Sequence, residues 1–213
     1  MELPAPPPEN GALKGRIAII GWGSLIWDLD DLAPRVEGAW LMRAGPVLPF
    51  EFSRISPKRK LALAVCLDAD RGAPCPTNAI LSTRDDIHQA AEDLRARERA
   101  QAVERIGAFC ARTGFRRSRI AEVGAAAADW CRATGAAGAV WTDLESNFEV
   151  MKGAPFSVAA GIAYLETLEG ESLTEAVRYI ENAPETTRTP LRMALEGNDW
   201  WRAQAARLRP QTA

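Results

Sequence analysis

A short apolar run that ends in glycines is the feature that most constrains the fold of this chain. Residues Ile17 to Ile20 are all apolar, as expected for a buried strand. The run stops at Gly21-Trp22-Gly23-Ser24, where glycine permits positive φ and lets a ligand approach the backbone. Peptide N–H groups in such a turn can point to one side and form an anion-binding nest. The sequence therefore predicts a strand followed by a tight loop, which is either a plain turn or a cradle for a small anion.

Two known motifs with similar glycines fit this loop poorly. A dinucleotide-binding fingerprint needs a third glycine where Ile26 stands, and it needs a long helix afterwards, whereas this chain soon reaches Pro34. A serine-hydrolase elbow needs glycine two places before and two places after the serine. Trp22 and Ile26 occupy those places around Ser24. The local residues therefore leave the plain turn and the backbone cradle as the two interpretations.

Strand patterns dominate the first part of the chain and helical patterns dominate the second. Phe50–Ile55 alternates apolar and polar side chains, Lys60–Leu67 is mostly apolar, and Ala79–Leu81 forms another short apolar run. Several strands without intervening helices, followed by a helical second half, predict an α+β fold with a small mixed or antiparallel sheet. We expect a disordered Pro-rich arm over residues 1–13 and a single domain over residues 14–213, with a helical C-terminal part.

Composition and charge favour a soluble enzyme or binding protein over a nucleic-acid or membrane protein. The chain has 213 residues, of which 47% are apolar and 25% charged, and its net charge is −2. This balance gives no electrostatic footprint for nucleic acid and no polybasic membrane patch. No apolar run reaches the ~18 residues that span a bilayer, and the first residues do not form a secretory signal. We therefore expect a cytoplasmic protein with a small-molecule partner; the sequence leaves the oligomeric state open.

Cysteine and histidine usage argues against a metal site. Cys66, Cys75, Cys110 and Cys131 show neither a C-x-x-C pair nor a zinc spacing, so we expect reduced thiols in the core. His88 is the single histidine, and it lies on a predicted helix without an obvious partner for nucleophilic catalysis. We expect no metal and no other cofactor.

A helix is predicted after Thr83, and it directs one carboxylate towards the core. Thr83 and Asp86 form a variant of the capping box. Glu98 occupies the gap in the apolar stripe that follows, and an acid among apolar neighbours suits general acid–base catalysis. The alternative is that Glu98 forms an ion pair with Arg95, Arg99 or an arginine elsewhere. The stripe consists of Ile87, Ala91, Leu94, Ala102, Ile106 and Phe109, so the spacing predicts that the helix continues or restarts through residues 102–113.

Arg54 is a second candidate for ligand binding. It lies on a predicted strand beside Phe52, whose side chain suggests a buried face. An arginine that faces a cavity could bind a carboxylate through two parallel hydrogen bonds. The alternative is a surface arginine that is ion-paired or extends its charge to solvent.

Two of these stretches resemble the γ-glutamylcyclotransferase-like family, whose first strand ends in Tyr-Gly-Ser-Leu or Tyr-Gly-Ser-Asn. Gly23, Ser24 and Leu25 match that loop, and Trp22 stands where the tyrosine is usual. Leu94-Arg95-Ala96-Arg97-Glu98 is similar to the element that carries the family's catalytic glutamate. The two motifs stand in the expected order and cover roughly residues 16–100.

The resemblance implies a fold and a reaction. The fold would be a small mixed or antiparallel sheet or barrel with surrounding helices. Residues Gly21 to Leu25 would hold a γ-glutamyl group, with Arg54 as a further binding candidate, and Glu98 would be the general acid/base. The reaction would release 5-oxoproline from a γ-glutamyl amine or peptide by intramolecular amide attack, without a cofactor. The alternative function is a non-catalytic small-ligand-binding or interaction module on the same scaffold.

Overall fold

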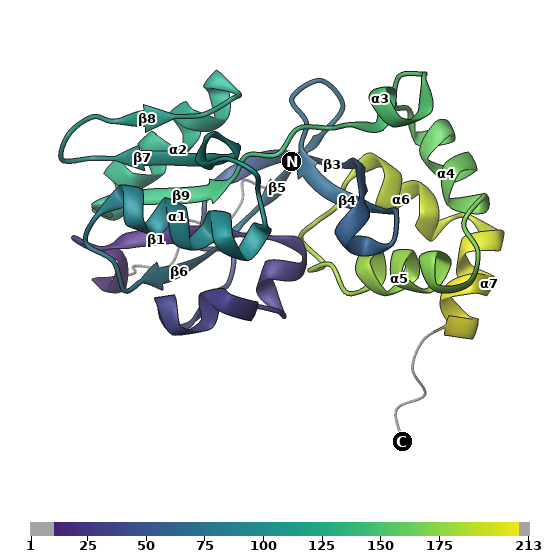
Figure 1. The fold of residues 1–213 in the computed structure, drawn as a ribbon, viewed down its shortest axis with the longest axis horizontal. Helices are drawn as coiled ribbons and strands as arrows, with labels where there is room; N and C mark the ends of the chain where they lie inside the picture. The colour runs from purple at the N-terminus through teal and green to yellow at the C-terminus, as the bar shows by residue number, and fades with distance from the viewer. Residues whose placement is uncertain (1–10, 209–213) are drawn as a thin grey trace. The chain divides into compact units, whose positions relative to one another are not determined.

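The computed structural model describes residues 11–208, and the contacts between Cα atoms divide the chain into two compact units (Figure 1). The first unit comprises the residues up to 48 together with residues 76–144. The second comprises residues 49–75 and the residues from 145 onwards. The prediction of a single domain over residues 14–213 stays a prediction.

The first unit is built on a six-stranded mixed sheet with the order β2-β6-β1-β9-β7-β8. The central strand β1 pairs in parallel with β9, with Ile17 opposite Gly138, and antiparallel with β6, with Ala18 opposite Leu81. The predicted α+β class with a mixed sheet is therefore confirmed. The strands are β1 (Ile17–Gly21), β2 (Val36–Leu41), β6 (Asn78–Ser82), β7 (Ile106–Cys110), β8 (Arg116–Arg117) and β9 (Gly138–Thr142).

Helices cover this sheet because its central strands are apolar on both faces. All five residues of β1 are buried, as expected for a strand with a near-continuous apolar run. Ile87 and Leu94 of α1 lie in one buried cluster with Ile19 of β1 and Val140 of β9, and α2 contacts β7 and β9. The helical elements are η1 (Gly11–Leu13), η2 (Gly23–Ile26), η3 (Asp30–Arg35), α1 (Ile87–Glu98), η5 (Val103–Arg105) and α2 (Ala121–Thr134).

The second unit combines a three-stranded sheet with a set of helices. The strand order is β4-β3-β5, and β3 pairs antiparallel with β4. The predicted helical C-terminal part is present: Ser157 and Thr189 cap α4 and α6 through their side chains, and Pro190 opens α6. The elements are β3 (Val47–Ser56), η4 (Pro57–Arg59), β4 (Ala62–Leu67), β5 (Ala73–Pro76), α3 (Phe148–Lys152), α4 (Val158–Glu166), α5 (Gly170–Glu181), α6 (Pro190–Glu196) and α7 (Asp199–Leu208).

Two predictions about local structure are corrected. The helix does not continue through residues 102–113: α1 ends at Glu98, where Arg99 takes the left-handed conformation, and residues 106–110 form β7. All residues of β7 are buried, and periodicity cannot separate a short buried strand from a buried helix. The arm predicted over residues 1–13 is also too long, because residues 11–13 form η1 and Leu13 is fully buried; residues 1–10 lie outside the described part.

Within residues 11–208, no helix is both long and apolar enough to cross a membrane.

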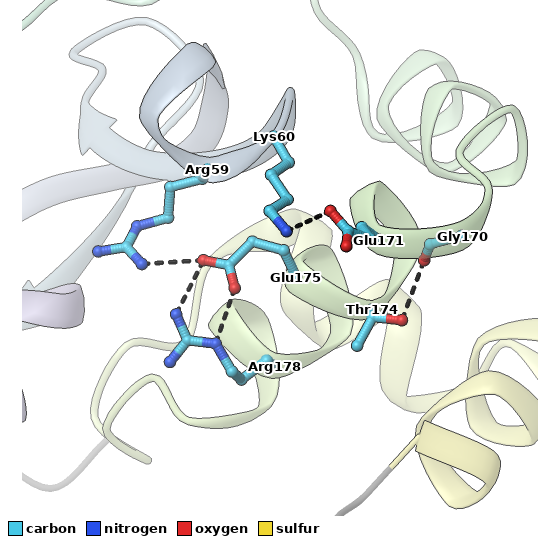
Figure 2. Close-up of polar contacts among 7 residues, drawn as sticks. All are labelled: Arg59, Lys60, Gly170, Glu171, Thr174, Glu175 and Arg178. Atoms are coloured by element: carbon cyan, nitrogen blue, oxygen red, sulfur yellow. Dashed lines mark hydrogen bonds and ion pairs between the residues drawn. The ribbon is translucent and has the colours of Figure 1, made fainter.

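An ion-pair network joins η4 to α5 in the second unit (Figure 2). Glu175 accepts hydrogen bonds from Arg59 at 2.9 Å and from Arg178 at 2.7 and 2.8 Å. Arg59 is itself buried and lies 4.6 Å from the centre of the Tyr179 ring. Burial opposes the charged form of Glu175, but the hydrogen bonds from Arg178 and Arg59 outweigh it and hold the pKa of this carboxyl below its usual value.

Replacing Glu175 with glutamine is expected to lower the free energy of unfolding by about 1–2 kcal/mol at neutral pH, because charge-assisted hydrogen bonds to a mostly buried group are lost. The folded pKa lies below the unfolded one, so this stability is present above the unfolded pKa and disappears as the pH falls through the folded pKa. The difference in the free energy of unfolding between wild type and Glu175→Gln should therefore disappear at acidic pH. Chemical denaturation at neutral and acidic pH measures it.

Glu171→Gln is the matched control, because Glu171 pairs with Lys60 across an exposed surface, with side chains 83% and 53% accessible. Ion pairs between solvent-exposed side chains contribute little to the free energy of unfolding. A Glu175 effect that does not change with pH, or an equal loss from Glu171→Gln, would contradict the prediction.

Candidate functional site

The glycine loop of the first unit has the tight conformation that its sequence predicts. Gly21 is the last residue of β1, and Trp22 follows in an extended conformation with φ −155° and ψ 177°. Gly23 then adopts φ +51°, a left-handed conformation that glycine reaches without a steric penalty. Ser24 and Leu25 continue into the 3-10 turn η2 and are almost fully buried.

Close packing explains why Gly21 is glycine. A Cβ atom at this position would lie 2.2 Å from Cη2 of Trp40, so the indole ring rests directly on the backbone. Asn78 at the start of β6 donates from its amide to the Gly21 carbonyl at 3.4 Å and accepts from the Arg43 amide at 2.8 Å. The neighbouring strand and Trp40 therefore hold the entry to the loop in place.

Two peptide N–H groups of the glycine loop make no hydrogen bond to the described residues and can donate to a ligand. The amide of Leu25 donates to the Trp22 carbonyl, and the amide of Asp28 donates to the Ser24 carbonyl at 2.9 Å. In the part of the chain that the structure describes, the amides of Gly23 and Ser24 and the Ser24 hydroxyl have no hydrogen-bond partner. Buried polar groups normally find partners. This loop can therefore donate to an external carbonyl or carboxylate.

Glu98 is the last residue of α1, and its carboxylate is ion-paired. Its Oε1 atom accepts a hydrogen bond from Nη1 of Arg97 at 3.0 Å, and its side chain is 16% exposed. The alternative of an arginine partner is thus the one observed, and the partner is Arg97. Arg95 and Arg99 instead contact Glu92 and Asp30. The Oε2 atom has no partner among residues 11–208.

Arg97 is the residue of this region that sequence reasoning missed. It is 1% exposed, and its Nη2 atom donates to the Asp28 carbonyl at 2.5 Å. The signal was present in the spacing, because Arg97 follows Leu94 by three positions and so lies on the buried stripe of α1. A charged residue on an apolar stripe marks a buried group that needs polar partners.

Arg97 links the C-terminal end of α1 to the residue that follows the glycine loop through hydrogen bonds. Its guanidinium contacts both Glu98 and Asp28, and the Asp28 amide contacts the Ser24 carbonyl. Leu25 lies in the same buried cluster as α1. The structure therefore joins these two predicted segments within one unit.

The remaining candidate, Arg54, belongs to the second unit. It is half-buried on β3, and its Nη1 atom donates to the Glu145 carbonyl at 2.6 Å. Its role as a ligand-binding residue stays a prediction.

Buried polar groups of the second unit form a structural cluster. Glu51 is fully buried and accepts from the amides of Phe52 at 2.7 Å and Leu191 at 3.1 Å, so it ties β3 to α6. Burial raises the pKa of Glu51, although hydrogen bonds from Phe52, Thr189 and Leu191 act in the opposite direction. Burial also raises the pKa of the Cys66 thiol to about 11, which makes it a poor nucleophile. As predicted, all four cysteines are buried free thiols.

Comparisons with protein-family models, curated proteins and solved structures each found no match to this chain.

Proposed function

We propose that this chain is a cytoplasmic γ-glutamylcyclotransferase-like enzyme with the corresponding fold, which releases 5-oxoproline from a γ-glutamyl amine or peptide. The observation that carries the proposal is the connection of Glu98, through Arg97 and Asp28, to a loop whose Gly23 and Ser24 amides are unused. The resemblance of both segments to the family's motifs supports the same reaction. The reaction class rests on this site and not on the fold.

The proposed reaction is an internal amide transfer. The α-amine nitrogen of the substrate attacks its own γ-carbonyl carbon and forms a five-membered lactam, while the bond to the leaving amine breaks. Developing negative charge on the carbonyl oxygen would be stabilised by the amides of Gly23 and Ser24. Since nucleophile and electrophile belong to one molecule, holding the substrate in a bent conformation lowers the entropic part of the barrier.

One carboxylate can perform both proton transfers. Glu98 would accept a proton from the attacking ammonium group and return it to the departing amine. Its Oε1 atom is held by Arg97, which leaves Oε2 for the substrate. The proton removed from the ammonium group is the one returned to the leaving amine, so the proposed reaction needs no metal or cofactor.

A lactam-release assay tests the proposal directly. The purified full-length chain is incubated with a panel of γ-glutamyl amines and γ-glutamyl peptides, and 5-oxoproline is measured by mass spectrometry. We expect release from at least one member, and none from α-glutamyl isomers, in which the γ-carbonyl is not part of the scissile amide. Failure to release 5-oxoproline from the whole panel would contradict the enzyme proposal.

The alternative function is a non-catalytic small-ligand-binding module. The Arg97–Glu98 ion pair favours it, because a carboxylate that is bonded to an arginine within the protein can have a purely structural role. Calorimetric binding of a γ-glutamyl compound without release of 5-oxoproline would support this alternative.

A further inference from the structure

The chain leading from β7 into α2 is rich in arginine, and of these arginines Arg119 is ion-paired with Asp143 at 3.9 Å. Several arginines elsewhere in the first unit are paired with carboxylates, as Arg16 is with Glu37 at 2.7 Å and Arg84 is with Asp93 at 2.6 Å. Residues 105–121, in contrast, contain no aspartate or glutamate. The arginines of this segment are Arg105, Arg112, Arg116, Arg117 and Arg119.

Three of these arginines lack a carboxylate partner in the described part of the chain. Arg112 and Arg116 are exposed and form no ion pair there. Arg117 donates from Nε to the Ile106 carbonyl at 2.8 Å, while its buried Nη2 atom has no partner within residues 11–208. The segment therefore holds guanidinium groups whose charge is not neutralised.

Aromatic side chains hold two of these groups in place. The guanidinium carbon of Arg116 lies 5.8 Å from the centre of the Phe109 ring, and that of Arg117 lies 5.8 Å from the Phe115 ring. The Phe115 ring in turn lies 4.8 Å from the ring of His88 on α1. Such cation–π contacts restrict the arginines before a partner arrives, which lowers the entropy lost on binding.

The same arginines lie on an edge strand. β8 is the last strand of the six-stranded sheet, and it pairs with β7 through Phe109 opposite Arg116 and Ala108 opposite Arg117. Among the described residues, no strand pairs with the other side of β8. An edge strand presents backbone donors and acceptors that an extended peptide can use.

We infer that the β8 edge docks an extended, acidic peptide segment of a partner protein. The peptide backbone would continue the sheet beside β8, and its carboxylates would pair with the exposed guanidinium groups of Arg112 and Arg116. The planar guanidinium group matches a carboxylate with two parallel hydrogen bonds. A peptide is favoured over nucleic acid because only a peptide can extend the backbone hydrogen-bond ladder of the sheet. The inference is independent of the proposed catalytic function.

Fluorescence anisotropy tests the inference with a short labelled peptide of alternating glutamate and threonine. We expect the full-length chain to bind this peptide at low salt, and the double variant Arg112→Gln/Arg116→Gln to bind it about tenfold more weakly. A peptide of the same sequence, with alternate backbone nitrogens methylated to remove strand donors, should also bind more weakly. Circular dichroism verifies that the double variant is folded.

Arg132→Gln/Arg207→Gln is the matched control, because it removes the same charge from two exposed arginines on α2 and α7. It should bind the peptide like wild type. The inference is overturned if the acidic peptide does not bind at low salt, if methylation has no effect, or if the control weakens binding as much as the double variant. Tighter binding of a single-stranded oligonucleotide of equal length would overturn it as well.

Discussion

Replacing Glu98 with glutamine is expected to slow 5-oxoproline release by about 10²-fold or more, the usual contribution of a general acid–base residue. Glutamine keeps an oxygen that can accept the hydrogen bond from Arg97, so the structure around α1 should be retained. Glutamine cannot take up the proton of the attacking ammonium group, so the loss should fall on kcat. Steady-state kinetics with the best substrate of the γ-glutamyl panel measures the effect.

Glu92→Gln is the matched control, because Glu92 lies on the same helix but is half exposed and pairs with Arg95. This control should have the kinetics of wild type. Turnover of Glu98→Gln within a few-fold of wild type would exclude Glu98 as the general acid/base, even if the wild-type chain releases 5-oxoproline. A loss of activity with a changed circular dichroism spectrum would point to misfolding, which thermal unfolding of the variant would detect.

Replacing Gly107 with alanine is expected to lower the free energy of unfolding by about 3 kcal/mol, the upper part of the range for overpacked cores. A Cβ atom on Gly107 would lie 2.0 Å from Cε2 and 2.1 Å from Nε1 of Trp141. The Trp141 side chain is fully buried, so the ring cannot move aside without displacing other core residues. Chemical denaturation of the wild type and the variant measures the difference.

The matched control for this prediction is Gly11→Ala, because a Cβ atom there would have no atom of residues 11–208 within 4 Å. This substitution should change stability by less than about 0.5 kcal/mol, as is usual on the surface. A Gly107→Ala variant as stable as the control would show that the β7–β9 region can relax around Trp141. Adding Trp141→Leu should recover part of the packing penalty, because a smaller side chain leaves room for the new methyl group.

Most local elements of this protein could be predicted from residue spacing. The apolar run of β1, the alternation of β3 and the apolar stripe of α1 are properties of neighbouring residues, and the corresponding strands and helix are present. The predicted capping box at Thr83 was wrong, because Asp86 caps α1 and accepts from the amides of His88 and Gln89. The C-terminal helices were predicted for the same reason. The prediction failed at β7, because a buried strand and a buried helix share one apolar composition and differ only in their neighbours.

Residue spacing predicts only part of the candidate site. The glycine loop and Glu98 are visible as motifs, whereas the partner of Glu98 is not. Helical spacing places Arg97 on the buried stripe of α1, but no local rule indicates that its guanidinium reaches the Asp28 carbonyl. Likewise, no pattern connects the buried Glu51 to the Leu191 amide, which lies 140 positions later.

The sequence by itself therefore determined most of the segments that become strands, helices and tight turns, with β7 as an exception, together with the chemical groups they carry. Only the tertiary structure decided that β1 lies between β6 and β9, that Arg97 joins α1 to the glycine loop, and that the arginines of β8 lie at a sheet edge. The physical reason is the range of the interactions. Backbone propensity and side-chain periodicity act over a few residues, whereas burial and hydrogen bonding of polar groups depend on which distant segments meet.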